Sequence, residues 1–140
     1  MKLVIDASVA LSWCFHDGRH PYSVEVLDLL QTADAVVPAI WPLELANSVV
    51  IAERRGRITT TATSNFIALI EGLGVQVDPH TSTHAWRETL SLARRYDLTA
   101  YDAAYLELAV RERLSLATLD EALAKAARKL QVPPMRGHHM

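Results

Sequence analysis

Four carboxylate residues stand at, or shortly after, the ends of short apolar segments. Asp6 follows the run LVI and Asp120 follows LATL, whereas Glu44 comes soon after AVVP and Asp102 lies early in an alanine-rich segment. Carboxylates about 4 to 6 Å apart oppose one another's ionisation, so a convergent cluster stays charged at neutral pH when a cation lies among them. These four residues therefore predict a cation site if the fold brings them together.

The donor atoms in this set are all hard oxygens, with no cysteine or histidine among them. Such donors favour Mg²⁺ or Mn²⁺ over zinc. An ion of this kind can polarise a phosphodiester and generate hydroxide from bound water. Each acid taken alone also has a structural explanation, because acids cap helix N-termini; Thr99 and Asp102 have the spacing of a capping box.

The elements that must position these acids follow from hydrophobic periodicity. Short runs of Val, Ile and Leu alternate with longer segments of helical period, as in a parallel sheet covered on both faces. The predicted strands are 3–5, 35–38, 75–77 and 115–119, and the predicted helices are 8–15, 22–32, 42–55, 60–72, 82–96, 100–113 and 121–130. This pattern predicts a three-layer α/β/α fold, in which ligands bind beyond the carboxyl ends of the strands.

Asp78 also ends an apolar run, VQV, so the strand-end pattern alone would admit it to the acidic set. If its strand lies at the edge of the sheet, Asp78 would stand apart from the others. Asp97 is expected to end the helix before Asp102 and to have no catalytic role. His80 and His84 have the spacing of two ligands on a helix, but no third ligand is evident.

Length and composition set the broad class. The chain has 140 residues, half of them hydrophobic, which predicts one globular domain over 1–136; residues 137–140 are read as a tag remnant or a disordered tail. The lone Cys14 fits a reducing cytoplasm, and no apolar segment approaches a membrane span. The net charge of -2 argues against binding nucleic acid through bulk positive potential.

Four segments together resemble a known family. LVIDASVAL, PLELANSVVIAERRGRI, LTAYDAAYLELA and LATLDEAL look like the four acidic blocks of PIN-domain ribonucleases, and in this short form like VapC toxins of toxin–antitoxin pairs. The resemblance implies an α/β PIN-like domain and a Mg²⁺-dependent endoribonuclease, with Mn²⁺ as a substitute, that leaves 5′-phosphate and 3′-hydroxyl ends. It also implies a homodimer, an RNA substrate and a VapB-type antitoxin.

The resemblance carries over position by position. Asp6, Glu44 and Asp102 match the core metal-binding and catalytic acids, and Asp120 matches a fourth acid whose contact with metal is less constant. Ser8 and Thr118 stand where the family often has hydroxyls that orient the acids.

Three further residues are interpreted from their own positions. Asn47, three residues after Glu44, could steady that acid or touch RNA. Arg54 and Arg55 could guide the RNA backbone, or could simply favour a helix C-terminus.

Two other classes of protein compete with the nuclease. A phosphoacceptor receiver domain also has acids at strand ends, but it needs an acidic pair after its first strand, and here Ala7 follows Asp6. A stronger rival is a non-catalytic PIN-like module that binds RNA or protein. Metal-dependent cleavage would exclude that module.

Overall fold

The computed structural model describes residues 1–15, 20–133 and 135, so residues 137–140 lie outside it. The strands are β1 (Lys2–Ile5), β2 (Asp34–Val37), β3 (Gln76–Val77) and β4 (Ser115–Ala117). They are parallel and form one sheet in the order β3-β2-β1-β4. Leu3 of β1 pairs with Ala35 of β2 on one side and with Ser115 of β4 on the other.

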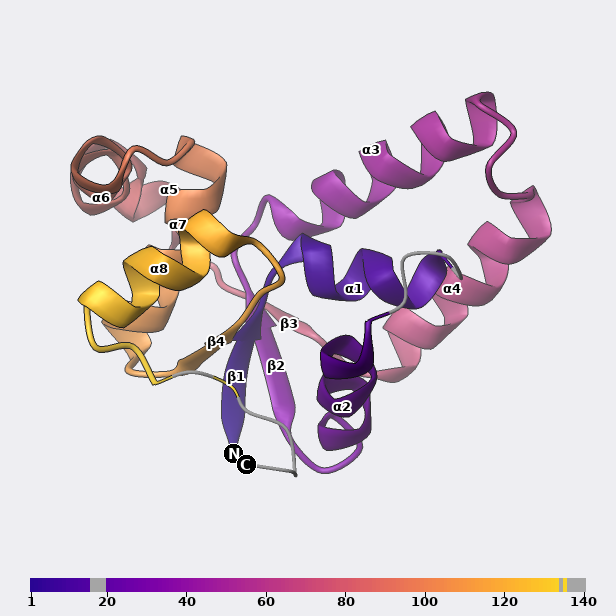
Figure 1. Ribbon diagram of the computed structural model, residues 1–140, viewed down its shortest axis with the longest axis horizontal. Helices are drawn as coiled ribbons and strands as arrows, with labels where there is room; N and C mark the ends of the chain where they lie inside the picture. Colours follow the sequence, from indigo (N-terminus) through magenta and orange to yellow (C-terminus); the bar gives the residue numbers. More distant parts are fainter. Residues whose placement is uncertain (16–19, 134, 136–140) are drawn as a thin grey trace.

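Helices cover both faces of the sheet and give the predicted three layers (Figure 1). On one side lie α1 (Ala7–Cys14), α2 (Pro21–Leu29), α3 (Trp41–Arg54) and α4 (Thr60–Gly72). On the other side lie α5 (Thr81–His84), α6 (Leu90–Tyr96), α7 (Ala100–Glu112) and α8 (Glu121–Lys129). Helices α3 and α4 form a hairpin arm that projects from the sheet (Figure 1).

The core lies between β1 and its neighbouring helices. Leu3, Val4 and Ile5 are fully buried, which explains why β1 reads as a continuous apolar run. Helix α7 is buried from Ala103 to Ala109. The small side chains of Ala103 and Ala104 let the start of α7 pack closely against its neighbours. Because α7 is buried, its first turn is held in a fixed position.

Most predicted elements are confirmed within a few residues, and several helix boundaries have residues that are common at helix ends. Pro21 and Pro42 lie in first helical turns, and Thr59 caps α4 by accepting the Ala62 amide. Gly56 follows α3 with a φ of +70°, a conformation that glycine adopts without penalty. Local rules therefore decide where these helices start and stop.

The predicted helix 82–96 was wrong as one continuous α-helix. A π-helical turn, η2 (Ala85–Thr89), interrupts it between α5 and α6, and the Leu90 amide donates to the carbonyl of Ala85. A π-turn takes up one more residue than an α-turn. The apolar period continues across this turn, so the interruption leaves little trace in the sequence.

Within the described part of the chain, none of the helices combines the length and the apolar character needed to cross a membrane.

Candidate functional site

The acids gather where the sheet reverses its winding direction. After β1 the chain adds β2 and then β3 on one side, and it later places β4 on the other side. Asp6 follows β1 and Asp120 comes shortly after β4, so these two acids flank the switch point. The Asp6 amide donates to the Ala117 carbonyl over 3.1 Å, which extends the β1–β4 ladder to the first acid. Ligands of open α/β sheets bind in this crevice.

Asp6 is the most buried of the four acids, with 4% of its surface exposed. Its Oδ1 accepts hydrogen bonds from the Ser8 hydroxyl at 2.6 Å and from the Val9 amide at 3.1 Å, and its Oδ2 accepts one from the Thr118 hydroxyl. Burial raises the pKa of Asp6 to about 6 despite these hydrogen bonds, and the negative charge of Asp102 adds to the effect. The folded protein therefore disfavours the ionised form of Asp6 when no cation is near it.

Glu44 and Asp102 reach the same region from α3 and α7. Burial raises the pKa of Glu44, and the nearby charge of Asp102 raises it further against a hydrogen bond from Tyr105. Burial also raises the pKa of Asp102, with the charge of Asp120 as the next cause. Asp102 thus interacts electrostatically with all three other acids.

The hydroxyls of Ser8 and Thr118, which were predicted to lie near the acids, each form hydrogen bonds to both the β1–α1 turn and the β4–α8 turn. Besides donating to Asp6, the Ser8 hydroxyl accepts from the Leu119 amide at 3.0 Å, and the Thr118 hydroxyl accepts from the Asp120 amide at 2.9 Å. Asp120 in turn caps α8 by accepting the Leu123 amide at 2.8 Å. These bonds join the two turns that flank the switch point.

Replacing Thr118 with Val tests this connection. We expect the free energy of unfolding to fall by about 1 to 3 kcal/mol, because the Asp120 amide and the Asp6 carboxylate each lose a partner in a partly buried setting. The pKa of Asp6 should also rise, since the Thr118 hydroxyl lowers it. Urea unfolding and carboxyl NMR titration measure the two effects. Thr61→Val on the exposed surface of α4 is the matched control, and an equal loss in both variants would contradict the role of the hydroxyl.

The chemistry of the donor set fits a hard divalent cation. The four acids offer only oxygen ligands, and their mutual repulsion would be relieved by positive charge. Across 1–15, 20–133 and 135, no three acidic, histidine or cysteine side chains are already arranged to hold a metal ion. Cation binding would therefore have to draw the four acids closer together than they lie here.

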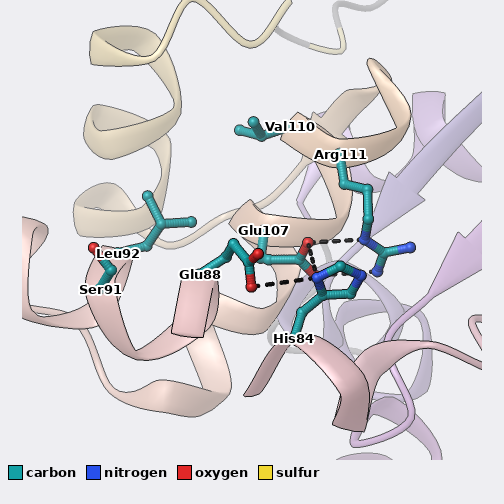
Figure 2. Close-up of a pocket in the computed structure, with 7 residues that line it drawn as sticks. All are labelled: His84, Glu88, Ser91, Leu92, Glu107, Val110 and Arg111. Atoms are coloured by element: carbon teal, nitrogen blue, oxygen red, sulfur yellow. Dashed lines mark hydrogen bonds and ion pairs between the residues drawn. The ribbon is translucent and has the colours of Figure 1, made fainter. Parts of the chain in front are cut away.

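Asp78 belongs to a different polar cluster. Strand β3 lies at the edge of the sheet, and Asp78 contacts Arg111 at 2.6 Å and the Thr81 hydroxyl at 3.1 Å. Arg111 also pairs with Glu107 at 2.8 Å, and His84 Nδ1 lies 3.3 Å from Glu88. Figure 2 shows Arg111, Glu107, His84 and Glu88 at a cavity of about 360 Å³ between α7 and the η2–α6 segment. Asp78 is therefore paired with Arg111 in this cluster, apart from the acids at the switch point.

The remaining predicted residues lie on the surface. Arg54 and Arg55 are exposed at the C-terminal end of α3, and Asn47 is exposed one turn after Glu44. Their contacts with RNA or with Glu44 stay predictions. Asp97 ends α6 with a φ of 54° and is exposed, as expected for a turn residue.

Tyr105 was not among the predicted residues, although its hydroxyl donates a hydrogen bond to Glu44 Oε1. Tyr105 lies three residues after Asp102, and that spacing on a helix was an available signal. Tyr22 of α2, whose pKa is raised to about 12 by burial and by the charge of Asp6, was not among them either. No local pattern marks Tyr22, because α2 and β1 are brought together only by the fold.

Comparisons with known proteins agree with this architecture. The chain matches the PIN domain family over residues 3–129. It is 28% identical over 133 residues to Ribonuclease VapC3 of Pyrobaculum aerophilum, covering 95% of this chain and 100% of that protein. The crystal structure of PAE2754 from Pyrobaculum aerophilum is similar in fold, with a TM-score of 0.63, 24% identity and coverage of 90% and 87% of the two chains. The chain belongs to the PIN-domain family.

Proposed function

We propose that this protein is a Mg²⁺-dependent endoribonuclease that also accepts Mn²⁺, and that it acts as the toxin of a type II toxin–antitoxin pair in the cytoplasm. The observation that carries the proposal is the position of Asp6 and Asp120 beside the switch point of the sheet, where the Ser8 and Thr118 hydroxyls join their two turns. The charge of Asp102 raises the pKa of both Asp6 and Glu44, which supports the same site. The relative named as a ribonuclease, whose whole length aligns with this chain, supports the same activity.

The ion would be held by Asp6, Glu44 and Asp102, with Asp120 as a fourth acid. When bound, a divalent ion lowers the pKa of water for attack on a phosphodiester and offsets charge on the leaving oxygen. The chain's own contribution is orientation and burial. Ser8 and Thr118 fix both oxygens of Asp6, so the most buried acid presents one geometry.

The RNA backbone is proposed to approach over the C-terminal end of α3. Arg54 and Arg55 are exposed there, ten and eleven residues along the chain from Glu44. Because the protein has a net charge of -2, binding would depend on these local cations and would weaken with salt. Asn47, between Glu44 and the arginines on α3, is a further proposed contact.

Partner surfaces are proposed on the α3–α4 arm. Leu43 and Ile67 are large apolar residues with 67% and 47% of their surface exposed. A cleft of about 240 Å³ runs between the two helices and is lined by Trp41 and Phe66 among others. Exposed apolar surface of this kind is typical of protein interfaces, so a homodimer and a VapB-type antitoxin are the proposed partners.

The test of function is cleavage of a labelled RNA by the purified protein with Mg²⁺, with Mn²⁺ and with excess EDTA. We expect cleavage with either ion, fragments with 5′-phosphate and 3′-hydroxyl ends, and loss of cleavage in EDTA. Asp102→Asn, purified in parallel, controls for contaminating nuclease. RNA binding without metal-dependent cleavage would instead support the non-catalytic PIN-like module.

A further inference from the structure

Tyr105 lies deep in the protein beside the acidic site. It is 1% exposed and projects from α7 one turn after Asp102. Its hydroxyl donates to Oε1 of Glu44, although the two residues are 61 positions apart in sequence. The phenol also lies close enough to Asp6 and Asp102 to interact with their charges. A polar group is thus buried among the carboxylates.

The hydrogen-bonding capacity of the phenol limits what it can do there. A phenol hydroxyl carries one hydrogen, so it donates to one acceptor at a time. Among the described residues, Tyr105 is the side chain that donates a hydrogen bond to Glu44. Glu44 has a second carboxylate oxygen, Oε2, and the bond to Oε1 does not occupy it. One oxygen of Glu44 is therefore held while the other stays available.

We propose that Tyr105 is a positioning residue that holds Oε1 of Glu44 and leaves Oε2 as the oxygen that binds the divalent cation. This inference rests on the proposed metal-dependent function. A long glutamate side chain loses rotamer freedom when it binds an ion, and a partner that fixes it beforehand reduces that cost. Hydrogen bonds from neighbouring side chains orient metal ligands in this way.

Two other roles for Tyr105 make different predictions. If the ring only fills the core, removal of the hydroxyl leaves cation affinity unchanged, because Phe keeps the ring. If the hydroxyl instead holds Glu44 away from the cation, its removal strengthens cation binding. The proposal requires that removal weakens binding, and that it does so through Glu44.

The experiment measures Mn²⁺ affinity by EPR titration of the full chain, without RNA. For Tyr105→Phe we expect affinity about 10- to 100-fold weaker than for the wild type, as found when partners of metal ligands are removed. Tyr101→Phe is the matched control, because Tyr101 lies on the same helix but is 61% exposed, and its affinity should not change. Thermal unfolding checks that each variant is folded.

A double-mutant cycle separates positioning from packing. In a Glu44→Gln background the same Tyr105→Phe change should have little further effect on Mn²⁺ affinity, because the two residues act as one unit. Equal losses in both backgrounds would overturn the proposal, as would unchanged or stronger binding by Tyr105→Phe alone. A wild type that binds no Mn²⁺ would overturn the proposed function together with this inference, whereas normal wild-type binding confines a failure to Tyr105.

Discussion

Replacing Asp6 with Asn should stabilise the metal-free protein at pH 8 while reducing RNA cleavage by about 100-fold or more. Asp6 has a pKa raised by burial from its ordinary value of 3.8 to about 6. A difference of this size between the folded and unfolded protein corresponds to about 3 kcal/mol. Asn cannot ionise, so the variant avoids this cost. Reorganisation of the Thr118 hydroxyl offsets part of the gain, which leaves about 1 to 3 kcal/mol.

The pH dependence gives the sign of the effect. A carboxyl whose pKa is higher in the folded state favours folding when it is protonated. The free energy of unfolding of the metal-free wild type should therefore fall as pH rises from 3.8 to about 6, and then level off. The gain from Asp6→Asn should be near zero at about pH 3.5, just below that range, and largest above about pH 6.5, just beyond its upper end.

Urea unfolding in EDTA at several pH values measures this effect. Asp97→Asn is the control, since Asp97 is exposed and Asn tolerates its left-handed φ; its stability should change by less than about 0.5 kcal/mol. Added Mg²⁺ should stabilise the wild type, by about 2.7 kcal/mol at one hundred times the dissociation constant, but not the Asp6 variant. If Asp6→Asn were less stable than the wild type at every pH, the buried charge of Asp6 could not be what destabilises the metal-free protein.

The architecture and the position of the acids could be predicted because they depend on local rules. Parallel strands buried on both faces read as apolar runs, and their carboxyl ends share one edge of the sheet. Asp6 follows such a strand directly and Asp120 comes shortly after another, so their proximity could be predicted before strand order was known. The N-terminal caps of α4 and α8 follow local rules as well, because Thr59 and Asp120 each accept a hydrogen bond from an amide three positions away.

What the sequence could not provide depends on contacts between distant segments. The hydrogen bond from Tyr105 to Glu44 joins α7 to α3, and the ion pair of Asp78 with Arg111 spans 33 positions. In one sequence, Asp78 and Asp6 look alike, since both end an apolar strand. Strand order distinguishes them, because β3 is at the edge and β1 is in the interior of the sheet.

The largest effect on stability is expected at Arg111. Its guanidinium lies between two buried acids, with hydrogen bonds of 2.6 and 3.3 Å to Asp78 and of 2.8 and 3.1 Å to Glu107. Arg111→Met keeps the aliphatic stem but removes the cation that both buried carboxylates share, and it leaves His84, 3.9 Å from Glu107, as the nearest remaining basic group. Removing one member of a buried ion pair typically costs about 3 to 5 kcal/mol, so a loss of this size is expected at pH 7.

The loss should become smaller in acid. Burial acts to raise the pKa of Asp78, but hydrogen bonds from Arg111 and the His80 amide outweigh it and hold the pKa below its ordinary value. Ionised Asp78 therefore stabilises the wild type above pH 3.8, and this stability is lost as pH falls through the lowered pKa. Without Arg111 the same carboxyl protonates more readily, so the difference between the two proteins shrinks toward about pH 3.

Chemical unfolding at pH 7 and pH 3 measures both parts of this prediction. Arg94→Met, an exposed position on α6, is the matched control and should change the free energy of unfolding by less than about 0.5 kcal/mol. Arg111→Lys should fall between the wild type and Arg111→Met, because it keeps the charge but loses the forked hydrogen bonds. Equal losses at both pH values would contradict this prediction, because they would show that the loss does not depend on ionised carboxylates beside Arg111.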